Sequence, residues 1–232
     1  MSGKPSPIFC ALDVPSPDEA LALARSVRED VGGFKLGLEY FCANGPQGVA
    51  VIKELGLPIF LDLKLHDIPE TVARAVRAVA GLGASYLTLH AQGGPAMLEA
   101  AASAALEFGA QRPRLLAVTV LTSLDAPDLM EIGVRDALEQ QVARLARLAA
   151  RRGADGIVCS PREITAVRQA IGPDRLIVTP GIRPAGADKG DQKRTMSPRE
   201  ALAGGADILV IGRPITAAAD PAAAARAIAQ SL

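Results

Sequence analysis

Short apolar runs recur along the chain, and each is followed by a segment in which Ala and Leu repeat with helical spacing. Apolar runs of four to eight residues between turn residues predict buried strands. The clearest helical spacing is that of Leu138, Val142, Leu145 and Leu148. We expect eight strands, at residues 8–14, 33–38, 58–65, 85–90, 115–121, 156–159, 176–179 and 207–211.

Several helix starts are marked by one repeated pattern. Segments 16–19, 160–163 and 197–200 each carry Ser, then Pro, then Glu three residues after the Ser. This spacing predicts a capping box, in which the Ser and Glu side chains bond to each other's backbone N–H groups. Asp220 and Pro221 open the last Ala-rich segment in a similar way.

Eight strand–helix alternations without a long linker predict a parallel sheet with crossover helices. Eight is the number that closes a (β/α)₈ TIM barrel, so we expect an α/β fold with one barrel domain over residues 1–232. An open doubly wound sheet is the alternative. Its glycine-rich first turn is missing, because Asp13, Val14, Pro15 and Ser16 stand there instead.

Composition narrows the classes of partner. Lys and Arg balance Asp and Glu, and the formal net charge is zero, so we expect no nucleic acid partner. The apolar runs are too short to predict a membrane span. The three cysteines are far apart and unpaired in spacing, which favours a reducing, cytoplasmic location. We expect Cys10 and Cys159, inside predicted strands, to be small buried hydrophobic residues.

The segment from Leu61 to Leu65 alternates leucines with Asp62 and Lys64. On a strand, such alternation places the two charged side chains together on one face and the leucines on the other. A surface strand with a solvated ion pair is one interpretation. The predicted barrel favours another, because the carboxyl ends of barrel strands carry active sites.

Polar residues lie at the carboxyl ends of most of the predicted strands, which together form one rim of the predicted barrel. Five or more at the same rim are hard to explain as solvated surface, so we expect an active site there. The residues are Asp13, Lys35, Asp62, Lys64, Asp67, Thr88, His90, Thr122, Ser123, Thr179, Arg183 and Arg213.

The residue types indicate a chemistry. The last two loops of a barrel often bind phosphate, and here they offer Gly212 and Arg213. The long polar loop at 183–196 is typical of a lid. A lysine between carboxylates is a proton donor rather than a Schiff-base nucleophile. Lys35 and Lys64 supply positive charge where a metal ion would sit, so we expect no metal and no cofactor.

Segment 62–71 closely resembles the signature of the orotidine 5′-phosphate decarboxylases, in their bacterial branch. Segments 11–13, 34–37, 120–123, 179–184, 191–194 and 211–215 agree with the same family, in order along the whole chain. Mg²⁺-dependent sugar-phosphate decarboxylases and aldolases of the same superfamily resemble segment 62–67 too. They place a carboxylate on the second strand, where this chain has Lys35.

The resemblance implies cofactor-free conversion of orotidine 5′-phosphate to UMP and CO₂ in de novo pyrimidine biosynthesis. It implies that Lys64 protonates C6 of the pyrimidine, that Asp62 lies beside the substrate carboxylate, and that Lys35 and Asp13 bind ribose hydroxyls. A non-catalytic barrel remains a third hypothesis, because a fold alone does not establish a function.

The resemblance also implies a homodimer with shared active sites, in which Asp67 and Thr71 reach the partner's site. The remaining implied contacts are Thr122 and Ser123 at the pyrimidine, and Arg183, Gln192, Gly212 and Arg213 at the phosphate.

The chain has two histidines, and we expect structural roles for both. His66 falls on the leucine face by alternation, away from Asp62 and Lys64. His90 points inward, and a packed, hydrogen-bonded ring is the simpler interpretation of it.

Overall fold

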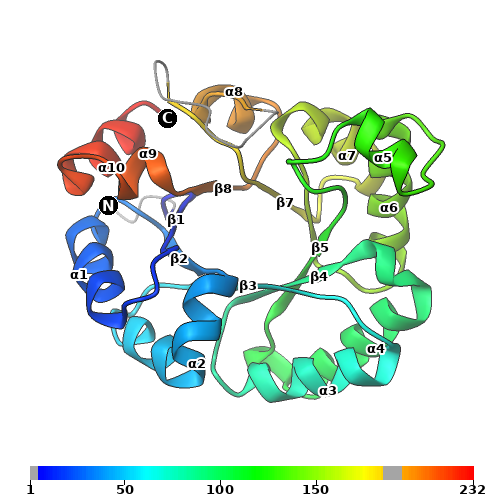
Figure 1. The fold of residues 1–232 in the computed structure, drawn as a ribbon, viewed down its shortest axis with the longest axis horizontal. Coiled ribbons are helices and arrows are strands. Elements are labelled where there is room, and N and C mark those ends of the chain that lie inside the picture. The colour runs from blue at the N-terminus through cyan, green and yellow to red at the C-terminus, as the bar shows by residue number, and fades with distance from the viewer. Residues whose placement is uncertain (1–4, 185–194) are drawn as a thin grey trace.

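Eight parallel strands close into a barrel in sequence order, with the helices arranged around the outside (Figure 1). The computed structural model describes residues 5–184 and 195–232. β1 pairs in parallel with β2 and also with β8, where Cys10 lies opposite Ile211. The predicted TIM barrel is therefore confirmed, and the open sheet is wrong. The strands are β1 (Ile8–Ala11), β2 (Gly33–Leu36), β3 (Ile59–Leu65), β4 (Tyr86–His90), β5 (Arg114–Val118), β6 (Gly156–Val158), β7 (Leu176–Thr179) and β8 (Ile208–Ile211).

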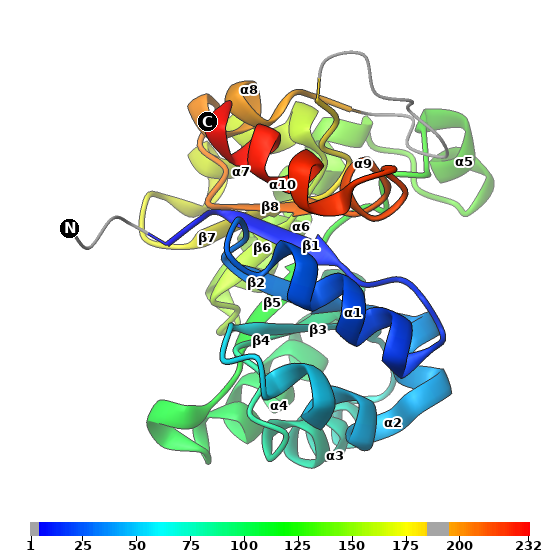
Figure 2. The ribbon, with the colours of Figure 1, turned by 90° about the vertical axis from the view of Figure 1, so that its left-hand side faces the viewer.

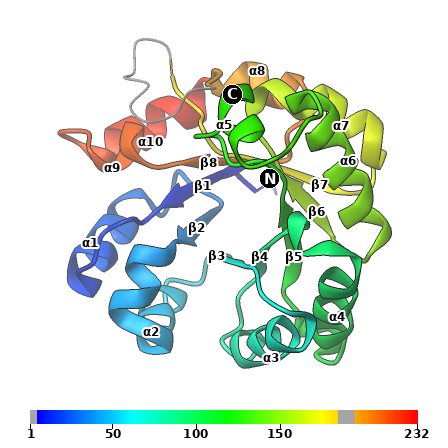
Figure 3. The same ribbon diagram turned by 45° about the vertical axis from the view of Figure 1, so that its right-hand side comes forward.

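The helices cover the strands on all sides. Figure 3 shows α1 and α2 on one flank and α6 and α7 on the other. Along the described part of the chain, no helix is long and apolar enough to cross a membrane. The α-helices are α1 (Pro17–Val27), α2 (Leu38–Lys53), α3 (Pro69–Ala80), α4 (Gly94–Leu106), α5 (Ala126–Glu131), α6 (Leu138–Arg151), α7 (Ile164–Ile171), α8 (Pro198–Ala203), α9 (Arg213–Thr216) and α10 (Pro221–Gln230), with 3₁₀ turns η1 (Ala91–Gly93), η2 (Gly109–Gln111) and η3 (Pro161–Glu163).

The predicted helix caps are present with one exception. Ser160 and Ser197 form full capping boxes at η3 and α8. The Ser16 side chain accepts a bond from the Glu19 N–H, but the Ser16 N–H makes no reciprocal bond to the Glu19 side chain, so only half of that box forms. Asp220 caps α10 by accepting from the Ala223 N–H. Local sequence therefore determines where these elements begin.

The barrel interior is filled at its amino-terminal end by aromatic rings. Phe9, Phe60 and Tyr86 meet edge to face, with ring centroids 5.6 to 6.4 Å apart. Inward side chains from several strands pack around them, as expected for a barrel of this type. This packed layer closes the floor of the barrel, so that space remains only toward the carboxyl ends of the strands, on the right in Figure 2.

The fifth strand ends earlier than predicted. We expected it to run to Leu121, but β5 ends at Val118. The N–H and hydroxyl of Thr119 both donate to the Val158 carbonyl, and the chain then leaves the sheet in a turn. Residues 121–123 therefore lie at the opening of the barrel rather than in its wall.

Gly33 is a position where the closed barrel excludes any side chain. A Cβ there would lie 2.7 Å from Phe9 Cζ and 2.7 Å from the Pro58 carbonyl oxygen. We expect Gly33→Ala to lower the free energy of unfolding by about 1–3 kcal/mol, because a backbone atom cannot move away cheaply. Thermal or urea unfolding followed by circular dichroism measures the change.

Gly81→Ala is the matched control for this substitution. Gly81 has a helical φ of −62°, and no described atom would lie within 4 Å of an added Cβ beyond its own neighbourhood in the chain. Its stability should be unchanged or slightly raised. Equal stability for both variants would contradict the packing argument.

Candidate active site

A cavity of about 510 Å³ lies at the carboxyl ends of the strands, above the aromatic floor. Phe60 forms part of its base. Nine of the twelve site residues that the family resemblance implies line it, although they come from six different strands and loops. They are Asp13, Lys35, Asp62, Lys64, Thr122, Ser123, Arg183, Gly212 and Arg213.

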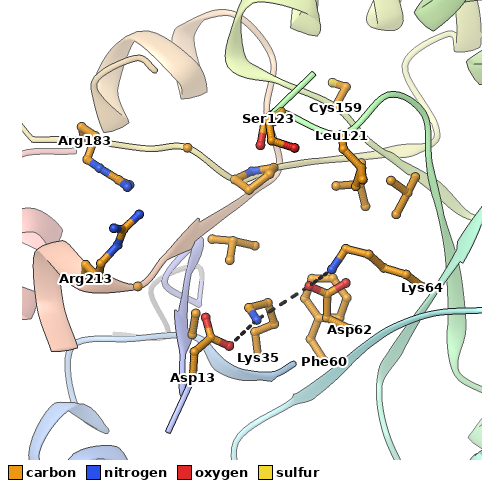
Figure 4. Close-up of a pocket in the computed structure, with 18 of the residues that line it drawn as sticks. Asp13, Lys35, Phe60, Asp62, Lys64, Leu121, Ser123, Cys159, Arg183 and Arg213 are labelled. Carbon is orange, nitrogen blue, oxygen red and sulfur yellow. Dashed lines mark hydrogen bonds and ion pairs between the residues drawn. The ribbon is translucent and has the colours of Figure 1, made fainter. Parts of the chain in front are cut away.

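Four of these side chains form a continuous charged network on one side of the cavity (Figure 4). Lys35 Nζ lies 2.8 Å from Asp13 Oδ1 and 3.7 Å from Asp62 Oδ2. Lys64 Nζ lies 2.8 Å from the same Asp62 oxygen. The sequence of charges is therefore negative, positive, negative, positive, and Asp62 lies between two ammonium groups.

Asp62 is ionised in spite of its burial. Burial by itself would raise the pKa of this carboxyl. The charges of Lys35 and Lys64, with hydrogen bonds from Lys64 and Thr88, outweigh that effect and hold the pKa below its usual value. The cavity thus contains a fixed carboxylate with an ammonium group against it.

The backbone of β3 does not alternate regularly through this site. Its pairing with β4 changes register between Leu61 and Leu65, and Lys64 has a φ of +49°. The prediction that Asp62 and Lys64 share a face is right in outcome, since both line the cavity. The structural reason differs from the predicted alternation. The backbone of Lys64 adopts a left-handed conformation that non-glycine residues rarely take.

The other side of the cavity carries the arginines. Figure 4 shows Arg183 and Arg213 directed toward one another, away from Lys64, with Ser123 and Leu121 on a third side. Arg183 is anchored by a bond from its N–H to the Met196 carbonyl, 2.9 Å, across the base of the seventh loop. Two guanidinium groups that face the same space are suited to a phosphate.

Two predicted site residues lie elsewhere. Asp67 and Thr71 are exposed after β3 and at the start of α3, outside the cavity. The Asp67 carboxylate accepts a hydrogen bond from the Ile68 N–H. Gln192, with most of the proposed lid, lies outside the described residues.

The two histidines contact each other, which alternation along a strand did not predict. Their ring centroids are 5.3 Å apart, with His66 directly after β3 and His90 at the end of β4. Burial lowers the pKa of His90, and His66 and Lys64 lower it further. Neither ring lines the cavity. The hydrogen-bonded ring expected for His90 is wrong at Nδ1, which is buried and has no hydrogen-bond partner among the described residues.

Cys10 and Cys159 are both buried, as predicted. Burial first, and the Asp13 charge second, raise the pKa of Cys10 to about 12, so its thiol is not a nucleophile at neutral pH. Cys159 lies just beyond β6 and lines the cavity.

Sequence reasoning missed the apolar walls of the cavity. Val118, Val120, Leu121 and Val158 line it beside the charged residues. A strand pattern cannot reveal them, because buried residues of this kind occur on both faces of every barrel strand.

Within residues 5–184 and 195–232, no group of three or more His, Cys, Asp or Glu side chains is placed to hold a metal ion.

Known proteins similar to this chain agree with one another. The model of the Orotidine 5′-phosphate decarboxylase / HUMPS family matches residues 6–228. The orotidine 5′-phosphate decarboxylase of Paramagnetospirillum magneticum is 54% identical, with 98% of each chain covered. That of Sphingopyxis alaskensis is 55% identical, with 98% of this chain and 99% of the relative covered.

Solved structures show the same likeness. A crystal structure of orotidine 5′-phosphate decarboxylase from Lactobacillus acidophilus matches with a TM-score of 0.84 at 38% identity, over 98% of both chains. Together with the barrel and its charged network, these matches show that the chain belongs to the orotidine 5′-phosphate decarboxylase / HUMPS family.

Proposed function

We propose that this protein decarboxylates orotidine 5′-phosphate to UMP and CO₂ in pyrimidine biosynthesis, as a cytoplasmic, cofactor-free enzyme with one barrel domain. The observation that carries the proposal is the content of one cavity. The Asp62–Lys64 pair lies on one side and two arginines lie on another. The chain around it is 54–55% identical to proteins with this name.

Lys64 is the proton donor in this proposal. As the bond between C6 and the carboxylate breaks, its electron pair stays on C6 and CO₂ departs. The Lys64 ammonium then transfers a proton to C6. Its contact with Asp62 Oδ2 at 2.8 Å holds the charged amine at a defined point in the cavity.

Asp62 has two effects in the same step. The substrate carboxylate enters beside an ionised group, and the departure of CO₂ removes this contact between like charges. The carboxylate also orients Lys64 before and after the reaction. Both effects require an ionised Asp62, because a protonated carboxyl would neither repel the substrate nor hold an ammonium group, and its lowered pKa is consistent with that state.

The rest of the cavity binds the nucleotide. Arg183, Arg213 and the backbone of Gly212 take the phosphate, and Thr122 and Ser123 take the pyrimidine. Gln192 is assigned to the phosphate by family resemblance. Asp13 and Lys35 bind the ribose hydroxyls, at one end of the charged network. Binding energy from the remote phosphate is thus available to stabilise the transition state at C6.

An Mg²⁺-dependent sugar-phosphate decarboxylase or aldolase is the alternative within this family, whose name covers more than one group. Lys35 argues against it. Its ammonium group lies between Asp13 and Asp62, and so occupies the position from which a second carboxylate would bind the metal.

We also propose that two copies of the chain share their active sites. Asp67 and Thr71 lie outside the chain's own cavity, on an exposed segment that continues β3. Ile68, which follows Asp67 in the chain, is 67% exposed, and Leu38, which follows the neighbouring strand β2, is 50% exposed. Covering such residues with a second copy would bury apolar area and carry Asp67 toward the partner's cavity.

The activity itself is tested with orotidine 5′-phosphate in the presence of excess chelator. We expect turnover, followed by the change in pyrimidine absorbance, at the same rate with and without chelator. The same sample with added Mg²⁺ is the control. Activity that disappears on chelation would favour the alternative, and bound nucleotide without turnover would favour a non-catalytic barrel.

Lys64→Ala tests the proton donor. We expect kcat to fall by a factor of about 10² to 10⁴, the usual contribution of a general acid, with folding retained. Lys53→Ala is the matched control, because the Lys53 ammonium donates to the Leu82 carbonyl on the outer surface and Lys53 does not line the cavity. Near-normal kcat in a folded Lys64→Ala protein would remove Lys64 from this role.

Mixing two inactive variants tests the shared site. A heterodimer of Lys64→Ala and Asp67→Ala chains has one site with both native residues and one with neither. Random assembly should therefore recover up to about a quarter of wild-type turnover. Heterodimers confirmed by mass spectrometry but without recovered activity would place all the required residues in one chain.

A further inference from the structure

Thr88 is a fully buried polar residue directly behind the charged network. It lies in β4 and is 0% exposed. Its side chain bonds to two points on β3, the Lys64 backbone and the Asp62 carboxylate, both at 2.9 Å. It does not line the cavity, so it touches the two proposed catalytic residues without facing the substrate.

The direction of both hydrogen bonds is fixed by chemistry. The Lys64 N–H can only donate, so Thr88 Oγ1 accepts from it. The ionised Asp62 carboxylate can only accept, so the single hydroxyl proton of Thr88 goes to Oδ1. The other oxygen, Oδ2, is left to Lys64 at 2.8 Å and Lys35 at 3.7 Å.

The backbone at Lys64 requires such support. It is the one non-glycine residue with positive φ among residues 5–184 and 195–232. That conformation is unfavourable for a residue with a side chain, and persists only where its surroundings impose it. Between Leu61 and Leu65, four steps along β3 match two steps of β4, from Leu87 to Leu89. Within that irregular segment, the Thr88 hydroxyl is the acceptor for the Lys64 N–H.

We propose that Thr88 is a positioning residue for this reaction. Its hydroxyl fixes the left-handed backbone of Lys64 and the orientation of the Asp62 carboxylate, so that the Lys64 ammonium meets Asp62 Oδ2 and points into the cavity. The inference rests on the proposed role of Lys64 as the proton donor. It adds a residue from β4 to a catalytic unit that is otherwise drawn from β1, β2 and β3.

Thr88→Val removes the hydroxyl and keeps the shape. We expect kcat to fall roughly 10- to 100-fold, since small misplacements of a catalytic group have effects of this order. KM should stay close to that of the wild type, because the phosphate and pyrimidine contacts are untouched. Thr88→Ser restores the hydroxyl and should recover most of the lost kcat.

The pH dependence of kcat separates positioning from packing. The Thr88 hydrogen bond is one of the causes that lower the pKa of Asp62. Its loss should therefore move the acid limb of the profile to higher pH in Thr88→Val, and Thr88→Ser should move it back. His90 also titrates on the acid side, but it is present in every variant, so the return of the limb reports the hydroxyl.

Thr119→Val is the matched control. Thr119 is also a buried threonine, 1% exposed, at a strand end. Its hydroxyl donates to the Val158 carbonyl, which keeps the Thr119 N–H as a second donor. We expect near-normal kcat and an unshifted acid limb. If Thr88→Val does not fold, Thr88→Cys replaces it, because its thiol takes the position of the hydroxyl and hydrogen-bonds only weakly.

Several results would overturn the inference. Wild-type kcat and an unshifted acid limb in folded Thr88→Val would do so, as would equal losses in Thr88→Val and Thr88→Ser. The Lys64→Ala variant keeps this outcome distinct from failure of the proposed function. If Lys64→Ala is inactive while Thr88→Val is normal, only the role of Thr88 is wrong. If Lys64→Ala is fully active, the proton donor is wrong.

Discussion

The carboxylate of Asp62 is the constraint on which the site depends. Its side chain is only 14% exposed, and an isolated charge at such a position is unfavourable by several kcal/mol. The two lysines and Thr88 compensate for that burial. Removing one partner would leave part of the charge uncompensated, so the members of the network are not independent of each other.

The same interaction links the site to the stability of the fold. Because the pKa of Asp62 is lower in the folded protein than in the unfolded chain, its ionisation favours folding at pH above the ordinary carboxyl value. This contribution is lost as the pH falls through the lowered value. The pairing of β1 with β2 and of β2 with β3 makes the interaction possible, since these strands must lie side by side to place Asp13, Lys35 and Asp62 in sequence.

The regular strand geometry is interrupted at Lys64, the residue proposed as the proton donor. The outer layer of the barrel and its aromatic floor follow ordinary packing and alternation. Irregularity is concentrated at Lys64, where the strand changes register and φ is positive. Strained backbone of this kind is characteristic of functional sites, because a group held in an uncommon conformation is already in place before the substrate binds.

Much of the molecule could be predicted from the sequence. The period of the apolar runs indicated eight strands and a barrel, and Ser–Pro–x–Glu segments located helix starts at Ser160 and Ser197. Both signals are local, since they arise from neighbouring residues in the chain. The polar residues at the strand ends could be collected into one rim for the same reason, because parallel strands in a barrel all end on the same side.

Other features were decided only by the tertiary structure. Alternation alone placed Asp62 and Lys64 together, but it could not show that a register change and a left-handed Lys64 bring this about. Thr88 stood among the rim residues without a role, because its two bonds join β4 to β3 across more than twenty residues of chain. The contact between His66 and His90 arises in the same way. Sequence by itself determined which elements form and which residues reach the rim; the closure of the barrel decided which of them meet, because those contacts depend on strand pairing between distant segments.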